Sequence, residues 1–181
     1  MGMYRKCATE ISARHQKQVS ASLLELMRKM PYEEITVTQL CQTAGITRRI
    51  FYHLFSNKMG ALHALLDSKI LDIENYGQEI SNDLLRFFRY WRDQKEFLDA
   101  LAENGMSGLL LERMISITLA EDYDIRYWLR LRGLAHQSKE IIVFGLSGLM
   151  GLVYSWYYSG YPQEPEEMVS LVEQMFPSYL S

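Results

Sequence analysis

The stretch 35–58, with the sequence ITVTQLCQTAGITRRIFYHLFSNK, constrains the fold more than any other part of the chain. Thr36, followed three residues later by Gln39, has the form of a capping box, which begins a helix. Gly45 supplies the positive φ that ends this helix, and Thr47 can cap a second helix directly after it. Two short helices around a glycine turn predict a helix-turn-helix, whose second helix enters the major groove of DNA by its N-terminal end.

Both expected helices have an apolar side. In the first helix, four apolar residues fall at i, i+3, i+4 and i+7, and in the second helix three apolar residues lie on the buried side. They are Val37, Leu40, Cys41 and Ala44 in the first helix, and Ile50, Phe51 and Leu54 in the second. Asn57 can then cap a longer third helix that opens with Lys58.

The run ITV…AGITRRIFYHLFSNK, in about the first third of the chain, resembles the DNA-binding signature of the TetR family of bacterial transcriptional regulators. The resemblance implies an all-α fold of about nine helices, in which an N-terminal three-helix DNA-binding domain precedes a C-terminal helical ligand-binding and dimerisation domain. We place the first domain at residues 1–60, with the motif at about 35–54, and the second at 61–181. The family usually has His or Tyr at the position of Leu54, where it often contacts a phosphate, which leaves open whether His53 replaces that contact.

Charge is distributed unevenly along the chain. Residues 1–60 contain nine Lys and Arg and four Asp and Glu, a net charge of +5, whereas residues 61–181 contain ten and eighteen, a net charge of −8. This asymmetry is typical of a basic domain that meets a polyanion, although small domains also differ by a few charges without such a partner. Two isolated cysteines and an N-terminus without a signal-peptide-like apolar stretch favour a reduced, cytoplasmic protein.

Eight residues are candidates for DNA contact. Arg48 and Arg49 begin the second helix, where a guanidinium can bind guanine O6 and N7 or clamp a phosphate. Thr38 faces the same side and can reach a base edge or a thymine methyl group. Hydroxyls and helix N-termini position a protein on phosphates, and the phosphate candidates are Thr36, Thr47, Tyr52, His53 and Lys58. The alternative is that the arginines are solvated surface and Tyr52 is a half-buried aromatic residue.

Residues 141–160, IIVFGLSGLMGLVYSWYYSG, contain no charge over a length that could span a membrane. Three internal glycines, three serines and the absence of a flanking basic cluster argue against a membrane helix. Ile142, Leu146, Leu149, Val153 and Trp156 instead repeat in a coiled-coil-like 4-3-4-3 pattern, beside a strip of small residues at Gly145, Gly148, Ser155 and Ser159. Because a helix that is apolar nearly all round is buried, we expect it to pack against its own chain and a second copy.

The last helix should begin near Pro165, which is preset for the first helical position. In the family that the chain resembles, the last two long helices of each subunit form a dimeric four-helix bundle. The resemblance therefore implies a homodimer, whose paired helix-turn-helix motifs would read a near-palindromic DNA operator. The predicted dimer interface consists of Leu146, Leu149, Val153, Trp156, Leu171 and Met175.

The resemblance also implies a small-molecule effector bound inside the second domain. Candidate pocket residues are Phe87, Phe88, Trp91, Phe97, Met106, Met114 and Trp128, although such aromatic stripes are more often plain core. The chain shows no metal-ligand spacing, implies no cofactor, and has no nucleophile setting or phosphate-binding loop of an enzyme. We expect a ligand-responsive homodimeric repressor; the alternative is an activator or co-regulator of the same fold that is controlled by a protein partner.

Overall fold

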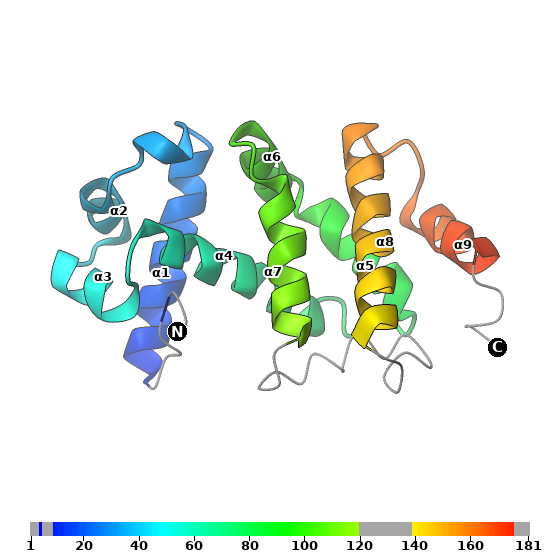
Figure 1. The fold of residues 1–181 in the computed structure, drawn as a ribbon, viewed down its shortest axis with the longest axis horizontal. Coiled ribbons are helices and arrows are strands. Elements are labelled where there is room, and N and C mark those ends of the chain that lie inside the picture. Colours follow the sequence, from blue (N-terminus) through cyan, green and yellow to red (C-terminus); the bar gives the residue numbers. More distant parts are fainter. Residues whose placement is uncertain (1–3, 5–8, 120–138, 176–181) are drawn as a thin grey trace. The chain divides into compact units, whose positions relative to one another are not determined.

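The computed structural model describes Tyr4 and residues 9–119 and 139–175, and these ranges contain nine α-helices, two 3-10 helices and no strand (Figure 1). The all-α fold expected from the sequence is confirmed. The helix expected within residues 122–137 lies outside the described ranges. The elements are α1 (Glu10–Met27), η1 (Tyr32–Glu34), α2 (Val37–Ala44), α3 (Arg48–Leu54), α4 (Lys58–Asp72), η2 (Ile73–Asn75), α5 (Asp83–Asp93), α6 (Lys95–Glu103), α7 (Ser107–Leu119), α8 (Lys139–Tyr158) and α9 (Pro165–Met175).

The helices form two compact units. Unit 1 combines the described parts of Met1–Ile70 with Phe97–Leu110, and unit 2 combines Leu71–Glu96 with the described parts of Leu111–Ser181. Three helices, α4, α6 and α7, therefore contribute residues to both units. The helix-turn-helix stretch lies wholly in unit 1.

Unit 1 is built around α1, which lies beside α2 (Figure 1). Thr9 caps α1, and its side chain accepts a hydrogen bond from the Ser12 N–H at 3.2 Å. The stripe formed by Val19, Leu23 and Met27 is fully buried, as its helical spacing predicts. Burial of this stripe against α2 fixes the helix-turn-helix on the rest of the unit.

Unit 2 has an aromatic core centred on α5, which packs on α8 and α9. Phe87 and Phe88 meet edge to face, with ring centroids 5.5 Å apart, and Phe88 meets Trp156 of α8 in the same way at 5.9 Å. Edge-to-face pairs are favoured because the positive ring edge contacts the negative ring face. These contacts bury one side of α8 against α5.

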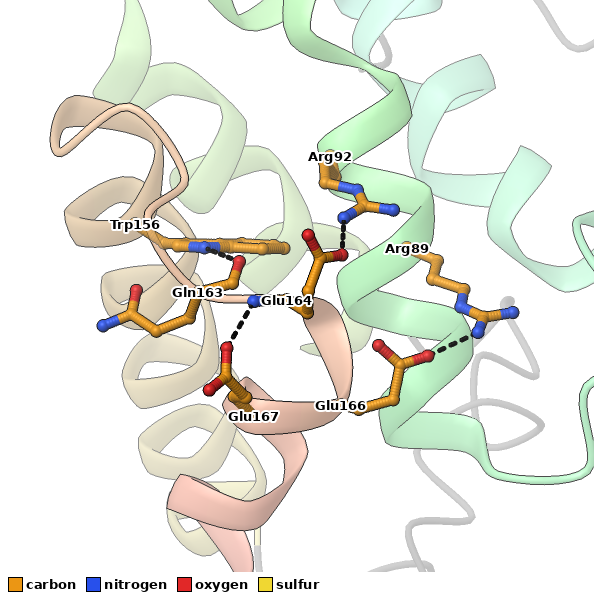
Figure 2. Close-up of polar contacts among 7 residues, drawn as sticks. All are labelled: Arg89, Arg92, Trp156, Gln163, Glu164, Glu166 and Glu167. Atoms are coloured by element: carbon orange, nitrogen blue, oxygen red, sulfur yellow. Dashed lines mark hydrogen bonds and ion pairs between the residues drawn. The ribbon is translucent and has the colours of Figure 1, made fainter.

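Polar contacts join the start of α9 to α5 and α8 (Figure 2). Arg92 forms an ion pair with Glu164 at 2.6 Å, and Arg89 pairs with Glu166. The Trp156 indole N–H donates to the Gln163 carbonyl at 3.0 Å. Because both ion pairs are largely exposed, each stabilises the unit only weakly, and they mainly fix where α9 begins.

The predicted dimer-interface residues of α8 and those of α9 differ in their exposure. Leu146, Leu149, Val153 and Trp156, which the sequence predicts at a subunit interface, are buried within the single chain because the core of unit 2 covers them. The other predicted interface residues, Leu171 and Met175 of α9, are exposed. The side of α8 that stays exposed is therefore a different one.

The exposed side of α8 follows its own regular stripe. Its members recur at intervals of three and four residues, which places them along one line on the helix, and all are exposed: Ile141, Phe144, Gly148, Gly151, Ser155 and Tyr158. We call this set the exposed α8 stripe. Phe144 is 70% and Tyr158 is 65% exposed, and a Cβ added at Gly148 or Gly151 would meet no atom within 4 Å.

By length and composition alone, α8 is also long and apolar enough to cross a membrane. Only 28% of its most apolar 18-residue window is buried in the chain. One such helix is weak evidence for a membrane span, since core and interface helices of globular proteins have the same composition.

Candidate nucleic-acid interface

Local hydrogen bonds define α2 as the sequence predicts. The Thr36 hydroxyl oxygen accepts from the Gln39 N–H at 3.1 Å, and the Gln39 side-chain oxygen accepts from the Thr36 N–H at 2.9 Å. This reciprocal pair is a complete capping box. At the other end, Gly45 has φ of 65°, and the Ile46 N–H reaches back to the Cys41 carbonyl at 3.0 Å. The left-handed residue ends α2 and turns the chain into α3.

We expect that replacing Thr36 by Ala lowers the free energy of unfolding by about 1 kcal/mol, because the Gln39 N–H loses its partner. Urea denaturation followed by circular dichroism measures the change. Thr43→Ala is the matched control, since Thr43 is an exposed residue inside the same helix. An equal effect of the two substitutions would contradict a specific capping role.

The helix α3 presents one polar and one buried side. Thr47 caps it by accepting from the Ile50 N–H at 3.2 Å. Phe51 and Leu54 are buried in unit 1, which orients the opposite side outward. The exposed predicted contacts on α2, α3 and their caps are Thr36, Thr38, Thr47, Arg48, Arg49, Tyr52 and His53. Their exposure leaves them accessible to a duplex.

Arg48 and Tyr52 form a pair on the exposed side of α3. The Arg48 guanidinium carbon lies 5.9 Å from the centroid of the Tyr52 ring, and the two residues are four apart, so they lie one turn from each other. A cation–π contact of this kind restricts the arginine side chain. This contact favours a side-chain orientation in which Arg48 lies over Tyr52.

Lys58 differs from the other predicted contacts, because it is engaged within unit 1. Its ammonium donates to the carbonyl oxygens of Tyr32 at 2.6 Å and Glu33 at 3.3 Å, and lies 4.2 Å from the centroid of the Tyr32 ring. Partial burial lowers the Lys58 pKa, while the nearby Glu33 carboxylate acts in the opposite direction. The structure therefore gives Lys58 a role in holding η1, and its expected phosphate contact stays a prediction.

Leu54 stands where the resembled family usually has His or Tyr. Leu54 is buried at the end of α3, so this side chain packs in the core and does not reach a phosphate. The adjacent His53 is exposed. His53 is therefore accessible to a ligand, and its phosphate contact stays a prediction.

Sequence reasoning missed two residues that bind to this region from far along the chain. Tyr4 forms an isolated antiparallel bridge with Phe55, and its hydroxyl donates to the carboxylate of Asp67. Asn104 receives a hydrogen bond from the backbone of Tyr32, 72 residues away. A carboxylate on the buried side of α4 was a usable signal for the first contact; Asn104 was recognisable only as part of a turn.

The residues predicted to line an effector pocket fall in different units. Phe87, Phe88, Trp91 and Met114 are buried residues of unit 2, Phe97 and Met106 belong to unit 1, and Trp128 lies outside the described ranges. Trp91 is fully buried, and its indole N–H has no hydrogen-bond partner in the described part of the chain. A buried donor of this kind costs free energy unless an acceptor satisfies it. Among the described residues no group of His, Cys, Asp and Glu could hold a metal ion.

Comparison with known proteins points to transcription regulators. No family model matches the chain. The chain is 30% identical over 87 residues to the HTH-type dhaKLM operon transcriptional activator DhaS of Lactococcus lactis, and the match covers 45% of this chain and 46% of that protein. The chain thus matches about half the length of this curated relative. The solved structure of a dihydroxyacetone kinase operon activator DhaS has a similar fold, with a TM-score of 0.57 at 17% identity over 92% of this chain and 96% of that one.

Proposed function

We propose that the protein is a DNA-binding transcriptional regulator and a member of the TetR family. The observation that carries the proposal is the capped helix-turn-helix, which presents Arg48 and Arg49 exposed in the first turn of α3. That end of the second helix is the part that enters the major groove in proteins of this class. The relatives found by comparison are transcription regulators and not enzymes, in agreement with the expectation that the chain is not an enzyme.

We further propose that the protein activates transcription. The repressor expected from the sequence rested on a family resemblance, whereas the relative with 30% identity is a transcriptional activator. The comparison therefore favours the alternative given above. As a regulator that meets chromosomal DNA, the protein would act in the cytoplasm.

The proposed protein is a homodimer, and we place the contact on the exposed α8 stripe together with Leu171 and Met175 of α9. Phe144, Tyr158 and Met175 are all more than half exposed, and exposed apolar side chains along one helix line favour a helix partner. Gly148 and Gly151 would let the partner's backbone come close. Two linked helix-turn-helix motifs would then read two half-sites of an operator.

An effector is the second part of the proposed regulation, either a small molecule or a protein partner. The Trp91 indole N–H supports a small molecule, because it is buried without a partner in the described ranges. A ligand with a hydrogen-bond acceptor would satisfy this donor. The exposed surface of unit 2 would serve a protein partner instead.

The test is selection of duplexes from a random DNA library with the full-length protein, followed by gel shift on the enriched sequence and on the region upstream of its own gene. We expect enrichment of a near-palindromic sequence and a shift that weakens as salt rises, because phosphate contacts release counterions. Absence of any enriched duplex at low salt would rule out sequence-specific DNA binding. Measurement of transcription from the enriched sequence with and without the protein then separates activation from repression.

A further inference from the structure

Asn104 connects three backbone segments of unit 1. Its side-chain oxygen accepts from the Tyr32 N–H at 2.5 Å, at the start of η1. Its side-chain nitrogen donates to the carbonyls of Ala100 at 2.7 Å and Met27 at 3.4 Å. Met27 is the last residue of α1, where carbonyls lack partners within the helix. One amide thus binds the end of α1, the start of η1 and the last turn of α6.

The orientation of this amide is determined by its partners. In the reverse orientation, the side-chain nitrogen would face the Tyr32 N–H and the side-chain oxygen would face two carbonyls, so every contact would join like groups. The three contacts are part-buried. Removal of the amide would leave polar backbone groups of Tyr32 and Met27 without partners, which is costly away from water.

Lys58 holds the same turn from its other side. The Asn104 side chain binds the N–H of Tyr32, while the Lys58 ammonium binds the carbonyls of Tyr32 and Glu33. Lys58 is the first residue of α4, and η1 ends two residues before the Thr36 cap of α2. The short segment η1 is therefore fixed between Asn104 and the two ends of the helix-turn-helix.

Asn104 lies in the turn that joins α6 to α7. It follows α6, and Gly105, with φ of 66°, turns the chain into α7. Most of α6, the turn and the first residues of α7 belong to unit 1, whereas Lys95 and Glu96 of α6 and the part of α7 from Leu111 onward belong to unit 2. In a second contact of α6, the Lys69 ammonium of α4 lies 5.8 Å from the centroid of the Phe97 ring.

We propose that Asn104 is a positioning residue for DNA binding: through η1 and Lys58 it sets the geometry of the helix-turn-helix, so that a change in the α6–α7 turn alters DNA affinity. The proposal rests on the proposed function. Asn104 acts through Tyr32 and Lys58 and contacts no DNA itself. A movement of α6 or of its turn would change this contact and, through it, the position of α2 and α3.

The experiment compares full-length Asn104→Ala with the wild type on the duplex that the wild type enriches, by fluorescence anisotropy over a range of salt concentrations. We expect the affinity for the duplex to fall about fivefold or more, because η1 loses its hydrogen bond to Asn104 and the helix-turn-helix is held less firmly in its binding geometry. The slope of affinity against salt should not change, because no phosphate contact is removed. Glu103→Ala is the control, as Glu103 is the exposed neighbouring residue, and it should bind like the wild type.

A double-mutant cycle tests the route through η1. If Asn104 and Lys58 act on one turn, the combined loss in Asn104→Ala with Lys58→Met should be smaller than the product of the two single losses. A purely structural Asn104 would lower the melting temperature and leave the affinity of the folded protein unchanged. Wild-type affinity in folded Asn104→Ala, or losses that multiply fully, would overturn the proposal.

A second variant at Asn104 and hydrogen exchange at the Tyr32 amide test the same contact independently. If Asn104→Ala does not fold, Asn104→Leu, which keeps about the same size and loses both the acceptor for the Tyr32 N–H and the donor, should show the same loss of affinity. Hydrogen exchange at the Tyr32 amide reads the turn without DNA and should accelerate in Asn104→Ala; unchanged exchange would overturn the positioning role alone. Failure of the wild type to enrich any duplex would overturn the proposed function and this inference with it.

Discussion

Replacement of both Arg48 and Arg49 by Ala should weaken binding to the enriched duplex by about a hundredfold or more. Both side chains are exposed in the first turn of α3, and a bidentate arginine–guanine pair contributes about 1–3 kcal/mol. Any phosphate contact that is lost adds to this effect and lowers the salt slope by roughly 0.9. In the proposed dimer, each substitution changes both subunits, so the complex with one operator loses two arginines for each substituted position. Anisotropy titration at several salt concentrations measures both the affinity and the slope.

The control variant separates direct contact of Arg48 and Arg49 with DNA from the general effect of removing two positive charges. Arg28→Ala with Lys29→Ala removes the same charge from unit 1, at two exposed residues that follow α1 and lie outside α2 and α3. It should cost much less than the α3 double variant, because it acts on DNA only through the long-range field, and the Lys29–Glu25 ion pair that it removes is exposed and weak. Both variants should keep wild-type helicity and mass. Equal losses in the two variants would show that Arg48 and Arg49 act only through net charge.

The helix-turn-helix could be predicted because its signals are local. Thr36, Gly45 and Thr47 each satisfy backbone groups within a few residues, so the sequence pattern and the hydrogen bonds coincide. The buried side of α3 followed from helical spacing in the same way. Burial of Leu54 and exposure of His53 agree with that spacing.

The contacts of Lys58 and Asn104 could not be predicted, because their partners lie 26 and 72 residues away. A lysine after a capping residue looks like a phosphate contact until the carbonyls of η1 are placed beside it. Similarly, Asn104 before a glycine is recognisable as a helix end, but its side-chain partners depend on how α6 packs on α1. Local propensity carries no information about such contacts.

The buried side of α8 could not be predicted from spacing, because this helix is apolar nearly all round. Two stripes with nearly the same spacing run along it, and the sequence favoured the one with larger side chains as the dimer contact. The structure buries that stripe within unit 2, where Trp156 packs against Phe88 of α5. Large side chains fill a core well, while the stripe with glycines is left exposed.

Replacement of Gly148 by Arg should therefore convert the proposed dimer to a monomer and weaken operator binding by about a hundredfold. Gly148 lies in the middle of the exposed α8 stripe, and nothing lies within 4 Å of an added Cβ, so the substitution does not disturb the single chain. Because Arg is a better helix former than Gly by up to about 1 kcal/mol, α8 itself should not be weakened. In the dimer, however, a charged side chain would meet a closely approaching apolar helix, and burying an unpaired charge is costly.

Sedimentation equilibrium measures the mass, and anisotropy measures the affinity for the enriched duplex. Gly108→Arg is the matched control, since Gly108 is an exposed helical glycine of α7 with equally open surroundings; this variant should remain a dimer. Loss of DNA binding should accompany loss of the dimer, because a monomer reads only one half-site. A Gly148→Arg protein that keeps the dimer mass would show that the subunits meet elsewhere. A wild-type monomer that still enriches a palindrome would show that the two copies pair only on DNA.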